Sequence, residues 1–401
     1  MTATKLPKGW SQKPLASLVH PDRKISYGVV QPGDFEPNGI LLVRGQDYSD
    51  GWAKPDSMFR VSEAIDAPYR RARLKTGDIV MTIVGAGTGN IAIVPDYLDG
   101  ANITQTTARI AVNKTIADRD FIRLVLESHI GRHEVYRNIK GGAQPGLNIG
   151  DVEKFQIPTP PLAEQCKIAI TLMPWITALE KLDALIAAKA RRKEALMQQL
   201  LTGQRRLPEF NKPWVQTTFG QFLAESRIEG SDGLTAQKIT VKLYGRGVLA
   251  KQERMVGSSN TKYFIRRAGQ LIYSKLDFLN GAFGIIPPEL DGYESTLDLP
   301  AFDVKPSADA RWLLAYLVRP EFYEKQVGAA AGGRIARRVN PPEFLKLRIK
   351  APEVSEQRAI AAVLSTADAE LRLLCQQRTA LDHQKRGLMQ QLLTGKKRVT
   401  L

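Results

Sequence analysis

The stretch Leu196-Met-Gln-Gln-Leu-Leu-Thr-Gly203 ends a segment that this chain contains twice. Residues 160–206 align with residues 352–398 without a gap, at an offset of 192 positions, and 19 of the 47 aligned positions are identical. The quoted stretch returns unchanged at 388–395. Two unrelated helices would not share so many residues. A duplicated chain presents two similar surfaces and can bind a partner that itself repeats, and duplex DNA is one such partner.

The repeat extends beyond this segment, because the same offset relates residues in the preceding part of each half. The pairs include Gly77 with Gly269, Gly89 with Gly281, Ile93 with Ile285, Pro95 with Pro287 and Asn148 with Asn340. Nearer the start the offset widens to 204, where Trp10 corresponds to Trp214. A fixed spacing of anchor residues with free variation between them predicts one fold used twice. We expect the two copies to contact different things.

The bulk properties favour a multidomain protein with a polyanionic partner. A chain of 401 residues is too long for one compact core and suits about two to four domains. The net charge of +16 favours phosphate neutralisation. No apolar run approaches the length of a bilayer-spanning helix, and residues 1–10 lack the apolar core of a signal peptide. Because Cys166 and Cys375 do not make a disulfide framework, we expect reduced thiols in a cytoplasmic protein without a membrane role.

Each half is predicted to contain a globular domain followed by a long helix. The predicted domains are a first globular domain at 1–158, a central spacer helix at 159–206, a second globular domain at 207–350 and a C-terminal spacer helix at 351–401. Short apolar runs separated by Gly, Pro, Asn and Asp indicate strands and turns in the globular domains. We expect a mixed α+β fold with a curved antiparallel sheet and one helix in each copy, at Asp120–Asn138 and Ala308–Val327.

The two long helices carry apolar residues three and four positions apart, over a length typical of a coiled-coil seam. The residues predicted to pair the helices are Leu172, Leu179, Leu182, Leu196, Leu200, Leu364, Leu371, Leu374, Leu388 and Leu392. Gly203 and Gly395 stand where a left-handed C-cap belongs. The simplest assembly packs the helices as an antiparallel coiled coil with one globular domain near each end.

Pro174 has no counterpart in the second copy, where Thr366 occupies the position. It predicts a kink or a restart of the first helix. The residues from Pro174 to Leu201 would span about 42 Å at 1.5 Å per residue. This length is close to one turn of B-DNA, about 34 Å. The helix pair is therefore predicted to act as a ruler between two DNA half-sites.

Three motifs resemble catalytic or ligand sites, and each has a structural explanation that we prefer. Asn340-Pro-Pro-Glu-Phe344 resembles the tetrad of DNA adenine methyltransferases, but a glutamate interrupts it, and an N-capped short helix is the simpler interpretation. Gly85-Ala-Gly-Thr-Gly89 is followed by a second strand, which favours a hairpin turn over a nucleotide loop. His129 and His133 have a metal-like spacing without an evident third ligand.

The remaining sequence features are polar loops that suit binding to DNA. The loop from Lys140 to Asn148 and its counterpart from Ala329 to Asn340 combine glycines with Arg, Lys, Asn and Gln. Arg pairs bidentately with guanine, and Asn or Gln with adenine. The residues predicted to bind DNA are Arg44, Gln46, Lys140, Gln144, Asn148, Lys275, Arg334, Arg337, Arg338 and Asn340. The alternative for each of these residues is that it lies in a solvent-exposed surface loop and binds no ligand.

Together these features resemble the DNA-specificity subunit of a type I restriction–modification system, over the whole chain. The resemblance is carried by Gly142-Ala-Gln-Pro-Gly-Leu-Asn148, which runs into Ile157-Pro-Thr-Pro-Pro161 and Glu164-Gln165, and by the repeated helix end at Leu196–Gly203. It implies two target-recognition domains that each read one half of a split DNA sequence. The second copy departs from the pattern in one linker, where Pro352-Glu353 replaces Pro160-Pro161.

The resemblance also implies that partner subunits do the chemistry. Two methyltransferase subunits would dock on the helices and bring S-adenosylmethionine, and motor/nuclease subunits would bring ATP and Mg. The chain itself is expected to bind double-stranded DNA without catalysing a reaction and without its own cofactor or metal. Two alternatives stay open: a stand-alone DNA adenine methyltransferase that uses residues 340–344, and a coiled-coil scaffold with no role in DNA binding.

Overall fold

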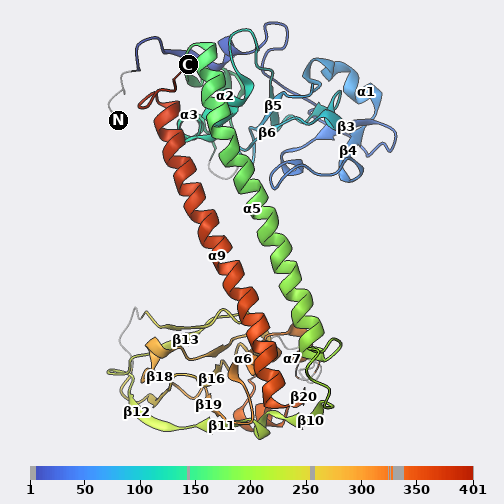
Figure 1. The fold of residues 1–401 in the computed structure, drawn as a ribbon. Coiled ribbons are helices and arrows are strands. Elements are labelled where there is room, and N and C mark those ends of the chain that lie inside the picture. Colours follow the sequence, from blue (N-terminus) through green and yellow to red (C-terminus); the bar gives the residue numbers. More distant parts are fainter. Residues whose placement is uncertain are drawn as a thin grey trace. The chain divides into compact units, whose positions relative to one another are not determined.

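The computed structural model describes residues 6–141, 145–252, 258–323, 325, 327 and 338–400. The chain divides into two compact units, of which unit 1 is Met1–Asp183 with Gln376–Leu401 and unit 2 is Ala184–Cys375. Each unit contains a globular part and one segment of each long helix (Figure 1). The long helices therefore belong to both halves of the repeat.

Unit 1 is built on a four-stranded antiparallel sheet with strand order β2-β8-β5-β6. Its strands are β2 (Ser26–Tyr27), β8 (Thr107–Ile110), β5 (Ile79–Thr82) and β6 (Ile91–Ile93). All four residues of β5 are buried because both faces of this sheet are covered. Ile79 and Met81 belong to the main core with Phe121, whereas Val80 packs in a second cluster with Val43 and Leu98.

A second, smaller sheet has the order β4-β3-β7, formed by β4 (Phe59–Val61), β3 (Ile40–Val43) and β7 (Asn102–Ile103). The four-stranded sheet confirms the predicted antiparallel sheet, whereas β3 pairs with β7 in parallel, which was not predicted. Strand β1 (Ser11–Pro14) pairs with β9 (Gln156–Thr159) and brings the start of the globular part to the entrance of the long helix. The remaining short elements of unit 1 are η1 (Leu15–Leu18), η2 (Gly45–Asp47), η3 (Pro55–Ser57), α1 (Glu63–Asp66), η4 (Ala67–Ala72), η5 (Asp96–Leu98) and α4 (Ile149–Glu153).

The helix predicted at Asp120–Asn138 is two helices, α2 (Arg119–Glu127) and α3 (His129–Asn138). Ser128 separates them, because its hydroxyl donates to Val125 O at 2.7 Å and accepts from Ile130 N at 3.1 Å. The same residue thus ends one helix and caps the next, a role that serine favours over the helix interior. Sequence periodicity did not reveal this break.

Unit 2 repeats the arrangement of the first sheet. Its four-stranded sheet has the order β11-β19-β16-β17 and is antiparallel throughout. The strands are β11 (Leu223–Ser226), β19 (Ala301–Val304), β16 (Leu271–Tyr273) and β17 (Phe283–Ile285), and β10 (Val215–Thr218) pairs with β20 (Arg348–Ala351) as β1 does with β9. The predicted helix at Ala308–Val327 is α6 (Ala310–Leu317) followed by α7 (Pro320–Tyr323). Pro320 explains the break, because proline restricts the residue before it and begins a new helix readily.

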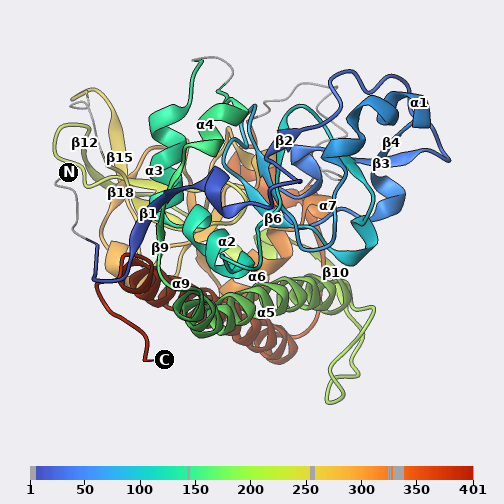
Figure 2. The ribbon, with the colours of Figure 1, turned by 90° about the horizontal axis from the view of Figure 1, so that it is seen from above.

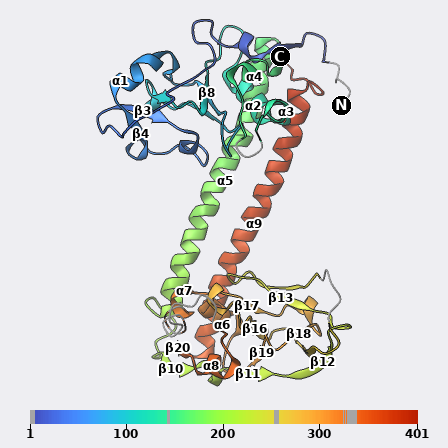
Figure 3. The same ribbon diagram turned by 180° about the vertical axis from the view of Figure 1, so that it is seen from behind.

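The periphery of unit 2 differs from that of unit 1. It contains a hairpin of β13 (Ile239–Val241) and β14 (Val248–Ala250) and a sheet of β12 (Ile228–Asp232), β15 (Lys262–Ile265) and β18 (Glu294–Ser295), visible in Figure 3. The short elements are η6 (Phe219–Gln221), η7 (Phe278–Asn280), η8 (Pro288–Leu290) and α8 (Pro341–Lys346). The repeat is therefore strict in the central sheet and loose at the edge.

The long helices are α5 (Leu162–Thr202) and α9 (Val354–Leu393). Helix α5 continues through Pro174 without restarting. Proline removes one hydrogen bond to the carbonyl four residues earlier, here that of Ile170, whose side chain is exposed to water. Gly203 and Gly395 follow the helix ends with φ of 73° and 71°, which confirms the two left-handed caps.

The helices lie side by side in Figures 1 and 2 and run antiparallel within each unit. In unit 1 the Arg378 Nε lies 3.0 Å from the Asp183 Oδ1, and in unit 2 Lys189 and Lys193 pair with Glu370 and Asp368, both at 2.5 Å. Residue numbers fall along α9 as they rise along α5, as an antiparallel pair requires.

Many residues predicted to pair the helices also fill the cores of the globular parts. The buried ones are Leu172, Leu179, Leu200, Leu364 and Leu392, and the half-buried ones are Leu182, Leu196, Leu371, Leu374 and Leu388. Leu172 and Leu392 join the core of unit 1, and Leu200 and Leu364 join that of unit 2. Each helix end is therefore part of a globular core. Between these ends, the predicted pairing residues Leu182, Leu371 and Leu374 are only half-buried.

A buried glutamate at the start of each long helix holds three segments together. In unit 1, Glu164 accepts from Trp10 Nε1 at 3.2 Å and from the Arg398 Nε and Nη2 at 2.9 and 2.6 Å. In unit 2, Glu356 accepts from Trp214 Nε1 at 3.2 Å and from the Arg206 Nε and Nη2 at 2.9 and 2.5 Å. We call each set of three residues a helix clamp. Because each arginine follows the end of the other long helix, each clamp also joins the two helices.

The glutamine that follows each clamp glutamate makes a second set of contacts that is the same in both units. Gln165 accepts from Asp118 N at 2.9 Å and donates to Pro160 O at 2.9 Å. Gln357 accepts from Asp309 N at 3.0 Å and donates to Pro352 O at 2.9 Å. Asp118 and Asp309 cap α2 and α6 through their carboxylates. The Glu-Gln pair thus fixes the long helix to the globular part in the same way in both units.

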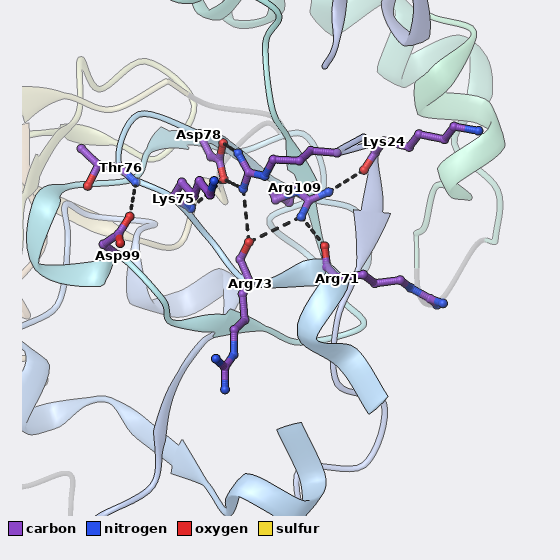
Figure 4. A network of polar contacts seen from close by, with 9 residues as sticks. Lys24, Arg71, Arg73, Lys75, Thr76, Asp78, Asp99 and Arg109 are labelled. Carbon is purple, nitrogen blue, oxygen red and sulfur yellow. Dashed lines mark hydrogen bonds and ion pairs between the residues drawn. The ribbon is translucent and has the colours of Figure 1, made fainter. Parts of the chain in front are cut away.

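A buried arginine joins the central sheet of unit 1 to η4 and to the segment before β2 (Figure 4). The Arg109 guanidinium in β8 donates to Lys24 O at 2.7 Å and to the carbonyls of Arg71 and Arg73 around η4. Burial lowers the pKa of Arg109 to about 10. Beside it, Arg23 forms a two-pronged ion pair with Asp78 at 2.7 and 2.5 Å. This network holds η4 against the central sheet.

Phe344 stands at the centre of an aromatic cluster in unit 2 and is fully buried. Its ring centroid lies 4.8 to 5.2 Å from those of Tyr273, Phe219 and Phe302. We predict that Phe344→Ala lowers the free energy of unfolding by about 3 to 5 kcal/mol, because it leaves a cavity in a packed core. The exposed Leu249 provides a control, since Leu249→Ala removes little buried surface. Chemical denaturation of both variants checks this, and equal losses would contradict it.

The helix clamps should matter more than ion pairs on the surface. We predict that Glu356→Ala lowers the denaturation midpoint clearly more than Lys212→Ala, which removes the exposed ion pair to Glu353. The glutamate change leaves both the Arg206 guanidinium and the Trp214 indole N–H without their acceptor. Thermal unfolding followed by circular dichroism measures the difference, and similar midpoints for the two variants would show that the clamp is dispensable.

Candidate DNA interface

A polar groove of about 630 Å³ lies on unit 1 where three loops meet. One loop follows β3 and contains Arg44 and Gln46, another is the β5–β6 hairpin with Asn90, and the last joins β7 to β8 and contains Gln105. The other polar residues of the lining are Ser49, Thr82, Thr104 and Thr106. We call this the unit 1 groove. The predicted residues Arg44 and Gln46 are brought together here with Asn90 and Gln105, which the sequence analysis did not single out.

Arg44 is held in place by a buried carboxylate. Its Nε and Nη2 donate to Asp47 at 3.2 and 3.0 Å, and Asp47 also accepts from Arg44 N at 2.8 Å. Asp47 is buried, whereas the Arg44 side chain is about one third exposed. The guanidinium also lies over the ring of Phe59, 5.7 Å from its centroid. Arg44 is therefore a fixed cation at the edge of the groove.

The amides of the groove are presented on a rigid backbone. Gln105 N donates to Val29 O at 2.8 Å, and Asn90 N donates to Gly87 O at 2.9 Å. Within the part of the chain that the structure describes, the side-chain amides of Gln46, Asn90 and Gln105 have no hydrogen-bond partner, and all three side chains are exposed. Their donors and acceptors are thus available to a ligand.

The loop that contains Lys140 and Asn148 packs against the same hairpin without lining the groove. Gly85 N donates to Pro145 O at 2.9 Å, and Lys140 N donates to Gly146 O at 2.9 Å. The Lys140 ammonium pairs with Asp151 at 2.9 Å, and this hydrogen bond lowers the pKa of Asp151. Asn148 precedes α4 as its N-cap residue. Gln144, which was also predicted to bind DNA, lies outside the described residues.

In unit 2 the structure brings together three of the predicted residues. Lys275 O accepts from Val339 N at 3.2 Å, and the Arg338 guanidinium lies 3.6 Å from Asp298, whose carbonyl accepts from Lys275 N at 2.9 Å. Asn340 follows as an exposed residue before α8. Arg334 and Arg337 lie outside the described residues. The backbone of Lys275 is therefore joined to the segment that carries Arg338 and Asn340; the Lys275 side chain is half-buried and the other two are exposed.

The structure decides between the two readings of two motifs. Asn340 and its prolines begin the short helix α8, with the backbone carbonyl of Asn340 accepting from Phe344 N at 2.9 Å. Because Phe344 is buried, its ring is not available to stack on an extruded base. The glycines from Gly85 to Gly89 form the turn between β5 and β6, with φ of 102° and 94° at the two ends. The hairpin turn and the short helix are thus confirmed, although the Asn340 side chain makes no capping hydrogen bond to α8.

Two general properties of the described residues bear on function. Within the described ranges, no group of three or more His, Cys, Asp or Glu side chains is arranged to hold a metal ion. No helix in this part of the chain has the length and apolar character needed to cross a membrane. Neither Cys166 nor Cys375 forms a disulfide bond.

Sequence reasoning missed the helix clamps and half of the groove. Trp10 and Trp214 are repeat anchors in the sequence, but the sequence does not show that each tryptophan meets a buried glutamate and the arginine that follows the other long helix. The signal for the arginines was available, because Arg206 and Arg398 are identical positions in the repeat. No such signal existed for Asn90 and Gln105, whose counterparts at the same offset are Ala282 and Leu297.

Comparisons with known proteins agree with this architecture. A family model described as the type I restriction modification DNA specificity domain matches residues 61–190. The type I restriction enzyme EcoBI specificity subunit of Escherichia coli is 34% identical over 163 residues, which are 41% of this chain and 34% of that protein. The MjaVIII specificity subunit of Methanocaldococcus jannaschii is 22% identical over 288 residues, 65% of this chain and 66% of that protein. The chain thus spans about a third of the first relative and about two thirds of the second.

Solved structures share the fold. A crystal structure of a type I restriction-modification system S subunit from M. genitalium superposes with a TM-score of 0.61 at 12% identity, covering 98% of this chain and 97% of that chain. A chain from a structure of a type I R-M system, described for its complex assembly and conformational transition, gives a TM-score of 0.59 at 19% identity over 98% and 100% of the two chains. The chain is therefore similar to type I restriction–modification specificity subunits in its fold, and residues 61–190 match the specificity domain of that family.

Proposed function

We propose that this chain is the DNA-recognition subunit of a type I restriction–modification system and that each unit reads one half of a bipartite target. The observation that carries the proposal is the repeated architecture: two central sheets of the same topology, each tied by the same helix clamp to a shared helix pair. The net charge of +16 suits a polyanion. The part of the groove from Thr82 to Thr106 falls within the matched specificity domain.

The chain would supply recognition while partner subunits supply the chemistry. Two methyltransferase subunits would bind along the helices and carry S-adenosylmethionine, and motor/nuclease subunits would carry ATP and Mg. The chain itself would be non-catalytic and would act in the cytoplasm, where its DNA substrate lies. The burial of Phe344 supports this over a stand-alone methyltransferase, because the aromatic residue of residues 340–344 has a structural role.

The helix pair would set the distance between the two half-sites. Helix α5 is a single helix of 41 residues, and its antiparallel pairing with α9 is held by Asp183–Arg378 on one side of residues 184–188 and by Lys189–Glu370 on the other. Because each helix end is packed into a globular core, a change in helix length would be passed on to the reading surfaces.

DNA binding is the first test. We predict that the chain, assembled with its methyltransferase subunits, binds its target duplex and loses about a thousandfold or more in affinity between 50 and 200 mM salt, as expected for six or more phosphate contacts. Fluorescence anisotropy at a series of salt concentrations measures this. A coiled-coil scaffold predicts no salt-dependent affinity.

Mapping methylated adenines in host DNA with and without this chain shows whether the bipartite pattern depends on it. Methylation by the purified chain alone would favour the stand-alone enzyme.

Helix length is the second test. We predict that a heptad inserted in residues 184–188 of α5, together with a matching heptad in residues 371–377 of α9, lengthens the spacer by about three base pairs, given a rise of about 10 Å per heptad. The two half-site sequences should stay the same. A heptad in α5 alone is the control, because it shifts the register of Asp183–Arg378 against Lys189–Glu370. An unchanged spacer in the methylation pattern of the double insertion would rule out the ruler.

A further inference from the structure

The unit 1 groove has the chemistry of a site that reads base edges. We propose that it contacts the major-groove edges of consecutive base pairs, with Arg44 reading a guanine and with the amides of Gln46, Asn90 and Gln105 reading neighbouring bases, adenine above all. The inference rests on the proposed DNA-binding function. It adds the residues, the base class and the half of the chain that makes the contact.

Arg44 is arranged to use one edge of its guanidinium. Asp47 engages the Nε and Nη2 groups at 3.2 and 3.0 Å. Among the described residues the Nη1 group has no hydrogen-bond acceptor, so the edge formed by Nη1 and the second N–H of Nη2 points away from the carboxylate. Such an edge matches the O6 and N7 acceptors of guanine bidentately. The buried Asp47 fixes the rotamer in advance and thereby reduces the entropy lost on binding.

The three amides suit adenine because each offers one donor and one acceptor on the same group. They come from three different loops that the fold brings to one groove. The backbone N–H groups of Gln105 and Asn90 donate to Val29 O and Gly87 O, and Gln46 O accepts from the Ser49 hydroxyl at 3.3 Å. Gly87 keeps the space beside Asn90 open, since a Cβ at this position would lie 3.2 Å from the Asn90 Nδ2. The groove therefore combines a rigid frame with side chains whose hydrogen-bonding groups are unused.

Among the described residues, unit 2 carries different groups at the positions equivalent to Asn90, Gln105 and Thr106. At the repeat offset, Asn90 and Gln105 correspond to Ala282, which is buried, and to Leu297. Thr106 corresponds to Asp298, whose carboxylate pairs with Arg338. The two units therefore present different groups at equivalent places on the same sheet. A guanine contact through Arg44 should consequently affect only one half of a bipartite target.

The experiment uses the full chain assembled with its methyltransferase subunits and duplexes that contain its mapped methylation motif. In each duplex one guanine is replaced by 7-deazaguanine, which removes the N7 acceptor and leaves base pairing intact. We expect the natural chain to lose affinity at one guanine of one half-site. Arg44→Ala should abolish that loss and reduce the preference for guanine at this position by roughly fivefold to a hundredfold. The other half-site should be read as before.

The control is Arg70→Ala, which removes an exposed arginine of the same unit that pairs with Glu63 outside the groove. It should leave the 7-deazaguanine effect in place. If Arg44→Ala does not assemble, Arg44→Lys, which keeps the charge but loses the planar fork, is compared in the same way. The inference is overturned if the arginine variant keeps the full 7-deazaguanine effect at every guanine, or if the natural chain shows none. A natural chain without affinity for DNA would instead overturn the proposed function.

Discussion

A buried carboxylate at the start of each long helix is the contact on which the architecture depends. Glu164 and Glu356 are fully buried, and each accepts hydrogen bonds from one tryptophan and one arginine that are distant in the sequence. A buried carboxylate is stable only when its charge and its hydrogen-bonding capacity are met. The contact therefore requires that the start of one helix, the end of the other and the beginning of the globular part meet at one place. The adjacent glutamine adds the cap of the domain helix to the same junction.

This requirement explains why the repeat is strict in some places and loose in others. Positions that supply the junction and the helix caps keep their residue types, as at Gly203 and Gly395, and the central sheets keep their strand order. The edges of the two sheets have no such constraint. There unit 1 pairs β3 with β7 in parallel, whereas unit 2 adds the β12–β15–β18 sheet. The duplicated parts are the central sheet, the helix caps and the helix clamp, whereas the strands at the edges of the two units differ.

The proposed recognition of DNA follows from that division. In unit 1 the loops at the free end of the sheets carry an arginine fixed by Asp47 and amides that have no partner within the described residues. In unit 2 the equivalent part of the sheet carries apolar residues and an aspartate paired with Arg338. Two different sets of hydrogen-bonding groups on similar frames are what reading two different half-sites demands, because each base pair offers its own pattern of donors and acceptors in the major groove.

The sequence by itself determined the duplication, the two long helices, their glycine caps and their antiparallel pairing, because these depend on local periodicity and on identities between the copies. It also marked Arg44 and Gln46 as a polar pair beside a strand. Only the tertiary structure decided the helix break at Ser128, the parallel pairing of β3 with β7 and the meeting of Asn90 and Gln105 with Arg44. The physical reason is that each of these depends on contacts between segments far apart in the chain, or on a side chain that competes with the backbone for hydrogen bonds. The periodicity of apolar residues in the sequence predicts neither kind of contact.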